Sequence, residues 1–263
     1  RKGWRAVTVF LHEIRLNRRQ TALWAGGVSF MILICLLIFP EMKAQMEDIN
    51  RIFSALGGFS EALGMNVLDF GTIMGFYGVE CGSMLGIGGG LFAALMGASM
   101  LSKEEGRYTA EFLFSHPVSR VRVVFSKLAA AWALLFAFDF ICMAVAVAGI
   151  LFIRESPDWG LFLQFHISQL TLHWELAAMG LAISAFLRRG GAGAGIAMTM
   201  MLYFINIVAN ITDSLSFLNY ITPYRYVNAS NIFSLGHMDG GLMLLGMFYA
   251  ALCLALGTAR YAR

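Results

Sequence analysis

Two carboxylates, Asp139 and Glu175, lie inside long apolar runs of this 263-residue chain. Ionisable groups within membrane-spanning segments are energetically expensive and are often functional. The two residues lie at similar distances from the inner ends of consecutive predicted spans, about 17 Å from that edge of the membrane. Consecutive antiparallel spans could bring them together as a negative patch that helps to pass a cation or a cationic amphipathic molecule. The alternative is that each carboxylate is protonated or hydrogen-bonded within the bundle.

Further polar side chains accompany these carboxylates at helical spacing. In the run that holds Glu175, one face carries Gln164, Ser168 and Thr171, and the opposite face carries His166, Gln169, His173 and Ser184. The next run places Thr199, Tyr203, Asn206 and Asn210 on one stripe. Because lipid penalises such faces, we expect both helices to turn them toward protein or a wet cavity. A translocation path would then be lined by Asp139, Glu175, Gln164, Thr171, Asn206 and Asn210.

The spacing of the residues does not favour a metal site or a nucleotide-binding motif. His166 and His173 are two helical turns apart, about 10 Å, which is too far for one metal ion. The four cysteines show no Cys-x-x-Cys spacing, so we predict no metal site. The run Gly86-Ile-Gly-Gly-Gly90 lies in an apolar segment, and no Gly-Lys dipeptide occurs in the chain. The phosphate-binding motif of ATPases is therefore missing, and we expect no ATP hydrolysis by this chain alone.

The elements that position these residues are long apolar helices. The chain is 59% hydrophobic and 13% charged, which is typical of a membrane protein. Apolar runs of about 18 residues or more predict transmembrane helices. Six such runs cover about 22–40, 79–101, 128–153, 162–187, 191–211 and 241–259. We therefore predict one all-α transmembrane domain over residues 1–263, with six spans.

Charge sets the expected orientation of this bundle. Basic residues gather before the first predicted span, in the 102–127 loop, and after the fourth and sixth spans, where 15 of the 19 lie. The opposite side holds Lys43, Arg51, Arg154 and Arg225. Because cytoplasmic loops carry the excess of Lys and Arg, both termini and the 102–127 loop are predicted to be cytoplasmic. The net charge of +3 is explained by topology, and binding to nucleic acid is not needed to explain it.

Two further helical patterns concern packing. Residues 3–19 are amphipathic, with Trp4, Val7, Leu11 and Ile14 on one face and basic residues on another. This pattern predicts an interfacial helix ahead of the first span. Small residues recur every four positions at Gly78, Gly82, Gly86 and Gly90. Such spacing places them on one helix face, where they would allow close helix packing.

The 102–127 loop is a dense polar segment between two apolar runs. It holds two acids and a glycine, a short segment with a threonine and a third acid, and then Pro117-Val-Ser-Arg120. Ser119 is placed to cap the helix that leads into the third span. The residues that we expect to carry its function are Glu104, Glu105, Gly106, Thr109, Glu111, Pro117, Ser119 and Arg120. Without a partner, the same segment would be a solvated turn.

This loop resembles the cytoplasmic coupling loop of permease subunits of type-2 ATP-binding-cassette (ABC) transporters. Leu218-Asn-Tyr-Ile-Thr-Pro-Tyr-Arg-Tyr226 is similar to the Leu-Thr-Pro-Phe-x-Tyr stretch before the last span of that family. The resemblance implies an N-terminal elbow helix and a cytoplasmic coupling helix between spans two and three. It also implies a separate ATPase, in two copies, that binds Mg-ATP, and a second permease copy or a similar permease subunit. Efflux of an amphipathic, lipid-like or cationic compound across a bacterial plasma membrane is then expected.

Other functions remain open from the residues. A secondary transporter could use Asp139, Glu175 and the histidines as a proton relay, although the two halves show no internal repeat. An intramembrane enzyme is disfavoured, because neither His-Glu-x-x-His nor Gly-x-Ser-x-Gly occurs. A sensor that reports a ligand to its ATPase would share the permease architecture. Substrate, direction of transport and dimer interface are not determined by the sequence.

Overall fold

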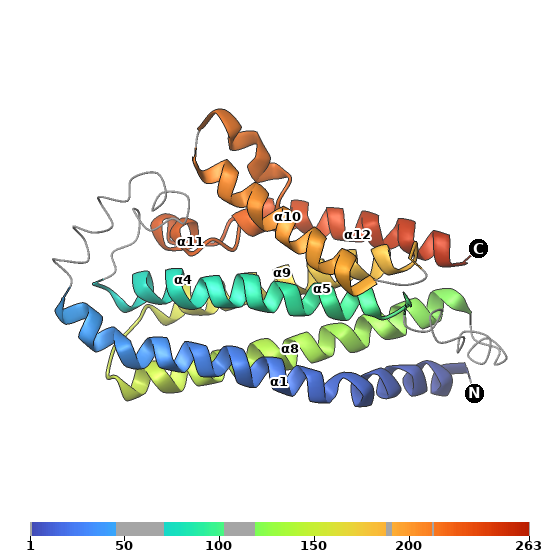
Figure 1. The fold of residues 1–263 in the computed structure, drawn as a ribbon, viewed down its shortest axis with the longest axis horizontal. Helices are drawn as coiled ribbons and strands as arrows, with labels where there is room; N and C mark the ends of the chain where they lie inside the picture. Colours follow the sequence, from blue (N-terminus) through green and yellow to red (C-terminus); the bar gives the residue numbers. More distant parts are fainter. Residues whose placement is uncertain (1, 46–70, 103–118, 188–190, 212, 263) are drawn as a thin grey trace.

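The computed structural model describes residues 2–45, 71–102, 119–187, 191–211 and 213–262, which fold mainly as helices (Figure 1). The first and last described residues lie at the same end of the molecule. The elements in chain order are α1 (Lys2–Ala44), α4 (Ile73–Ser83), the π-helical η1 (Met84–Gly89), α5 (Gly90–Ser99), α8 (Arg120–Phe152), α9 (Trp159–Ser184), α10 (Gly191–Ile211), the 3-10 helices η2 (Asp213–Tyr220) and η3 (Pro223–Arg225), α11 (Ala229–Leu235) and α12 (Gly240–Ala262).

Five helical segments are long and apolar enough to cross a membrane. They cover Val7–Ala44, Ile73–Ser99, Arg120–Phe152, Gly191–Ile211 and Gly240–Ala262. The second of these joins α4, η1 and α5 into one helix. The sixth predicted span, 162–187, coincides with α9, which has 26 residues but is too polar to meet the same standard of hydropathy.

Helix α9 packs against α5, α12, α8 and α10. Most polar side chains on its two predicted faces are buried, including Ser168 and His173 at 0% exposure and Glu175 at 3%, whereas Gln164 and Thr171 are half-buried. These faces therefore turn largely toward protein, while Leu163 and Ile167 of the same helix are exposed. In α10, Thr199 and Asn206 are buried, and Tyr203 and Asn210 are half-buried, so this stripe also faces inward.

The first helix differs from the prediction. Residues 3–19 do not form a separate elbow helix, because α1 continues from Lys2 to Ala44 and packs along α8. No proline or glycine interrupts residues 15–24, so the helix has no reason to break there. Val7 and Leu11 are 54% and 45% exposed, and Ile14 is half-buried. The side chain of Trp4 lies outside the described set.

Helix ends follow local capping chemistry. The Ser119 side chain accepts a hydrogen bond from the backbone N–H of Arg122 at 3.4 Å, which confirms the predicted cap of α8. Asp158 caps α9 by accepting hydrogen bonds from Gly160 and Leu161. Gly236 ends α11 in the left-handed conformation, with φ of 72°, which a residue with a side chain adopts at a cost.

The closest helix contacts involve other glycines than those predicted. A Cβ added at Gly97 would lie 2.1 Å from the Ala177 carbonyl oxygen, and one at Gly180 would lie 2.8 Å from that of Ala94. These positions bring the backbones of α5 and α9 together. Gly195 makes a similar approach between α10 and α5. The predicted stripe is in contact mainly with side chains, because a folded-back segment covers it.

That folded-back segment comprises η2, η3 and α11, between α10 and α12 (Figure 1). Its tyrosines divide into two groups. Tyr220 is 61% exposed, whereas Tyr224 and Tyr226 are buried at 3% and 1%. Pro223 starts η3, and the Thr222 hydroxyl accepts a hydrogen bond from Tyr224 N–H at its entry. The family-like Thr-Pro-Tyr stretch thus inserts aromatic rings into the bundle.

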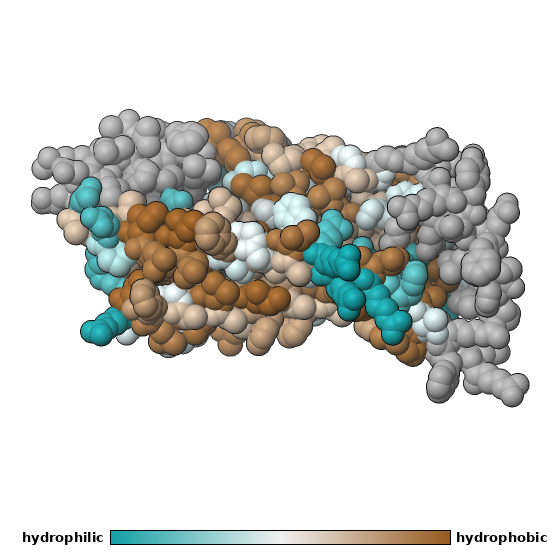
Figure 2. Space-filling model, turned by 60° about the horizontal axis from the view of Figure 1, so that its bottom comes forward, coloured by the Kyte–Doolittle hydropathy of each residue, from teal (hydrophilic) through white to brown (hydrophobic). Residues whose placement is uncertain are grey.

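The outer surface is apolar over its middle. Figure 2 shows hydrophobic residues between groups of hydrophilic residues toward each end of one face. Large exposed side chains on α1 and α8 include Phe30, Met31, Phe136 and Phe140. A surface of this kind fits contact with lipid or with a second membrane subunit.

Candidate functional site

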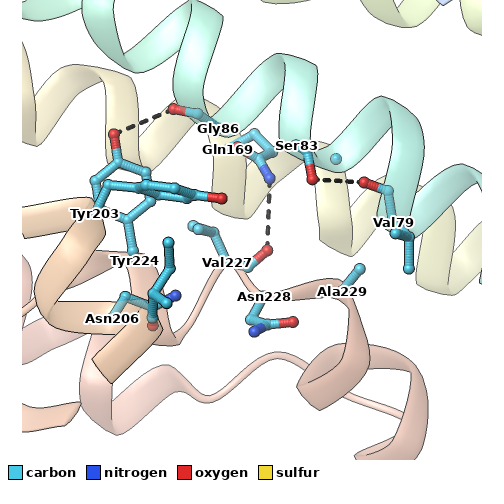
Figure 3. Close-up of a pocket in the computed structure, with 13 residues that line it drawn as sticks. Val79, Ser83, Gly86, Gln169, Tyr203, Asn206, Tyr224, Val227, Asn228 and Ala229 are labelled. Atoms are coloured by element: carbon cyan, nitrogen blue, oxygen red, sulfur yellow. Dashed lines mark hydrogen bonds between the residues drawn. The ribbon is translucent and has the colours of Figure 1, made fainter. Parts of the chain in front are cut away.

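A small polar pocket lies where α4, η1, α9, α10 and the folded-back segment meet (Figure 3). Its volume is about 60 Å³, enough for a few water-sized groups. The lining residues are Gly78, Val79, Gly82, Ser83, Gly86, Gln169, Tyr203, Asn206, Ile207, Tyr224, Val227, Asn228 and Ala229. Three of the four glycines of the predicted stripe therefore border this pocket.

Acceptor oxygens characterise this pocket. Gln169 Nε2 donates to the Val227 carbonyl at 3.5 Å, which leaves the buried Gln169 Oε1 without a hydrogen-bond partner among the described residues. The buried Asn206 Oδ1 is likewise unpartnered there. Such a lining can accept hydrogen bonds from water or from a small donor group.

The glycine stripe makes room for the folded-back segment. A Cβ at Gly78 would lie 2.5 Å from the Ala229 Cβ, and one at Gly90 would lie 2.5 Å from the Tyr224 hydroxyl. At Gly82 the nearest atom, in the Phe165 ring, would be 3.1 Å away, and at Gly86 the nearest would be 3.8 Å away. Gly86 thus borders open space within the pocket.

A buried hydrogen-bond network joins Asp139 to the π-helical segment. His173 Nδ1 lies 2.9 Å from Asp139 Oδ2, and His173 Nε2 lies 3.1 Å from the Leu85 carbonyl oxygen. At the next residue, the Tyr224 hydroxyl donates to the Gly86 carbonyl at 3.2 Å. π-Helical turns are rare and occur often at functional sites. Here two carbonyls of the turn accept hydrogen bonds from other elements.

His166 belongs to a separate aromatic cluster. Its Nε2 lies 3.0 Å from the Tyr77 hydroxyl, and its ring packs 4.6 Å, centroid to centroid, from that of Phe162. His166 and His173 thus have different partners. Within the described ranges, no group of three or more His, Cys, Asp or Glu side chains is arranged to hold a metal ion.

Asp139 and Glu175 border different cavities. Asp139 lines a 280 Å³ cavity with His166 and with residues of α8 and α9 such as Phe140 and Leu163. Glu175 lines a 180 Å³ cavity between α8, α9 and α12. The suggestion that the two carboxylates form one patch has no support in this arrangement, because Asp139 is in contact with His173 instead.

The remaining predicted path residues are dispersed. Gln164 Oε1 accepts a hydrogen bond from the Met238 backbone N–H at 3.1 Å, and the Thr171 hydroxyl donates to the Ile167 carbonyl. Asn210 Oδ1 accepts from Arg225 at 2.9 Å, and burial lowers the pKa of that guanidinium. Of the six predicted path residues, only Asn206 lines the small polar pocket and only Thr171 lines the Glu175 cavity with Glu175 itself.

The end of the molecule that holds the first and last described residues also holds a buried ion pair that sequence reasoning missed. Lys127 Nζ lies 2.6 Å from Glu13 Oε1, with side-chain exposures of 0% and 1%, and also donates to the Met100 carbonyl at 3.1 Å. We call these three groups the inner clasp. The clasp connects α1, the end of the α5 span and the start of α8. A signal was present, because Glu13 is the one acid in residues 1–40.

The 102–127 loop is only partly described. Glu104, Glu105, Gly106, Thr109, Glu111 and Pro117 lie outside the described residues. At its exit, Arg120 Nη1 donates to the Tyr261 carbonyl at 3.0 Å, which connects the start of α8 to the end of α12. The inner clasp and this contact both involve the N-terminal part of α8.

Glu80 is a second missed acid. It lines an open, mainly apolar groove of about 870 Å³ between α1 and the α4–η1 segment, together with Trp24, Met31 and Ile87. It is half-buried. It escaped notice because it lies near the edge of an apolar run, where a charged residue is unremarkable.

Comparison with protein families identifies the chain. A family model described as ABC-2 family transporter protein matches residues 7–263. The chain therefore belongs to this family, and it is an integral membrane protein that serves as a transport component and is not itself an ATPase. Membership implies a partner ATPase subunit. Comparison with curated proteins finds no match.

Proposed function

We propose that this ABC-2 family chain is the permease subunit of an ATP-driven exporter, coupled to its ATPase through the 102–127 loop. Two copies, or one copy and a similar permease, pair with two ATPase subunits that bind Mg-ATP. All six long helices cross the membrane, with α9 enclosed as the polar crossing. The shared end of the described termini and the concentration of basic residues support a cytoplasmic position for that end.

The inner clasp is the observation that carries this proposal. The loop leaves the bundle after Met100 and returns before Lys127, and these two residues are joined by a hydrogen bond. Lys127 is also paired with Glu13 of α1. A buried ion pair with a further hydrogen bond holds a fixed geometry, since separating its charges in a low dielectric is costly.

Mechanical coupling follows from this connection. A force on the loop would reach α5 and α8 together, and the clasp would carry it into α1. The contact between Arg120 and Tyr261 would extend it to α12. Rigid displacement of such helices on closure of an ATPase dimer is an ordinary route to a switch between two states.

The substrate class is proposed from the charged groups inside the bundle. Asp139, Glu175 and Glu80 each border a cavity or groove whose lining is largely apolar. Negative groups beside apolar surface favour a ligand that is both cationic and apolar. We therefore expect the substrate to be an amphipathic or lipid-like compound that is exported across a bacterial plasma membrane.

Co-purification with candidate ATPase subunits in detergent tests this function. The chain should form a stable complex with one of them and stimulate ATP hydrolysis. Glu104→Ala with Glu105→Ala should weaken the complex or uncouple hydrolysis from the permease, while Glu41→Ala, on the opposite side, should not. If no ATPase binds and the chain alone moves solutes along an ion gradient, the proposal fails.

An ion-gradient-driven transporter is the second candidate, and one observation favours it. Asp139 and His173 form a buried acid–imidazole pair, which is suited to exchange a proton. Under that alternative, Asp139→Asn would abolish transport without any ATPase present. Under the exporter proposal, transport requires ATP.

A further inference from the structure

The cavity beside Glu175 combines an acid with aromatic and aliphatic side chains. It has a volume of about 180 Å³ and lies between α8, α9 and α12. Its lining residues are Trp132, Thr171, Trp174, Glu175, Ala178, Met247, Ala250, Ala251 and Leu254. We call it the tryptophan pocket. Glu175 is the one ionisable side chain of this lining.

Glu175 has no charge partner in the described structure. The residue is 3% exposed, and neither carboxylate oxygen has a hydrogen-bond partner among the described residues. The buried Tyr226 hydroxyl lies beside this carboxylate and interacts with it as a hydrogen-bonding neighbour, although the contact falls short of good hydrogen-bond geometry. A tyrosine hydroxyl brings no positive charge, so the carboxylate still has no counter-ion among the described residues. Burying an ionised carboxylate without a counter-charge costs free energy, and a cationic ligand would reduce that cost.

The backbone of α12 holds this carboxylate in place. A Cβ added at Gly246 would lie 2.6 Å from Glu175 Oε2 and 2.9 Å from Oε1. Gly246 thus allows α12 to pass directly over the carboxylate, and the pocket lies beside this contact. The neighbouring Met247 is 48% exposed on the outer surface, so the pocket lies close to the lipid-facing side.

Two indole rings, one from α8 and one from α9, also line the pocket. Trp132 and Trp174 stack with centroids 5.3 Å apart. Each indole N–H donates to the backbone carbonyl of the other residue at 3.1 Å. Because both polar edges are satisfied by this reciprocal pairing, the rings are fixed and contribute apolar, electron-rich surface. Tryptophan is the side chain that attracts cations best through its ring face.

We propose that the tryptophan pocket binds the alkylammonium head group of an amphipathic molecule, with Glu175 as its counter-ion. A compact inorganic cation is a poorer fit, because it requires several oxygen ligands, and the lining offers side-chain oxygens only from Glu175 and Thr171. A trimethylammonium group needs apolar contact and one diffuse negative charge. The inference rests on the proposed exporter function and assigns its substrate class.

The other two acids that border cavities, Asp139 and Glu80, are less suited to act as the counter-ion of a bound cation. Asp139 already has His173 as its partner. Glu80 borders a much wider and more open groove, where solvent or lipid can reach it. Of these three acids, Glu175 alone combines near-complete burial, no cationic partner among the described residues and tryptophan neighbours.

Equilibrium dialysis of the full-length chain in nanodiscs tests the proposal. The nanodiscs contain phosphatidylethanolamine and phosphatidylglycerol, since choline head groups would compete. The probe is radiolabelled hexyltrimethylammonium, and empty nanodiscs correct for partition. Saturable binding is expected, with competition by unlabelled probe and none by its uncharged tert-butyl analogue. Glu175→Gln should weaken binding about tenfold or more, because it removes charge and keeps shape.

Matched variants on α12 keep the test informative if Glu175→Gln folds poorly. Ala251→Leu places a larger side chain in the pocket and should weaken binding at least about fivefold, in keeping with lost cation–π contact. Ala255→Leu lies one turn further on an exposed position and should leave binding unchanged. Equal binding by wild type, Glu175→Gln and Ala251→Leu would overturn the proposal, and so would equal competition by the uncharged analogue.

The two proposals can fail separately. Binding is measured without an ATPase, so a chain that couples to an ATPase but ignores the probe would refute only the pocket. A chain that binds the probe through Glu175 but recruits no ATPase would refute only the exporter function.

Discussion

Asp139 and Glu175 are carboxylates of consecutive helices, α8 and α9, at similar predicted depth, yet their surroundings differ. Asp139 has a buried histidine 2.9 Å away, whose other ring nitrogen contacts the π-helical segment. Glu175 lies beside the backbone of Gly246, two tryptophans and the Tyr226 hydroxyl, and it has no cationic partner in the described residues. The difference teaches that the first is part of the framework of the bundle, whereas the second is available to a ligand.

The inner clasp extends the comparison to a fully paired acid. Lys127→Met would leave Glu13 buried without its counter-charge, which typically costs about 3–5 kcal/mol of unfolding free energy. The loss should appear in chemical unfolding of the chain in mixed micelles. Lys43→Met is the matched control, because the Lys43–Glu155 pair is exposed and should cost less than about 1 kcal/mol.

Adding Glu13→Gln to Lys127→Met should recover part of that loss. Equal effects of Lys127→Met and Lys43→Met would show that the clasp contributes nothing beyond a surface ion pair. The proposed transmission of force from the loop to α1 would then lose its basis.

Asp139→Asn should produce the next largest effect. It removes a charge-assisted hydrogen bond to His173, worth about 1.5–3 kcal/mol of unfolding free energy. The same unfolding assay measures the loss. A variant as stable as the wild type would erase the distinction between Asp139 and Glu175.

Gly246→Ala tests the close approach of α12 to Glu175. The new Cβ would crowd both carboxylate oxygens, and overpacking of this kind costs about 1–3 kcal/mol. Gly26→Ala is the control, since no atom lies within 4 Å of its added Cβ and alanine favours the helix. Thermal unfolding should show a loss of stability for Gly246→Ala and none for Gly26→Ala. Adding Glu175→Ala to Gly246→Ala shortens the acid and should restore the lost stability.

Glu175→Gln should have the smallest effect on stability. The Glu175 carboxylate makes no hydrogen bond of good geometry, and glutamine can keep its contact with the Tyr226 hydroxyl, so the unfolding free energy should change by less than about 1 kcal/mol or rise. A large destabilisation would mean that the carboxylate has a structural partner, and Glu175 would join Asp139 in the framework.

Much of the fold could be predicted from apolar periodicity. The fifth span matches α10, and the third and sixth match most of α8 and α12, because runs of this length have few other structures in lipid. The polar faces of the fourth predicted span correctly indicated that most of its polar side chains are buried. The elbow was wrong as a separate helix, since amphipathicity identifies a face and contains no information about where a helix bends.

Partners across the bundle were beyond sequence reasoning. The pairing of Asp139 with His173 depends on the rotation of α8 against α9, which the spacing of residues in each helix does not fix. The clasp joins positions 13 and 127, and the buried Tyr224 depends on a chain reversal after α10. Side-chain facing was predictable within one helix, whereas contacts between helices required the packed structure.

ATP hydrolysis by the chain reconstituted with its ATPase tests the central claim most directly. Hexyltrimethylammonium should stimulate hydrolysis, and Glu175→Gln should shift the half-maximal probe concentration upward by about tenfold. Asp139→Asn should leave that concentration close to the wild-type value. An exporter with its cation site at Glu175 would be contradicted if the probe did not stimulate ATP hydrolysis. It would also be contradicted if both variants shifted the half-maximal probe concentration equally.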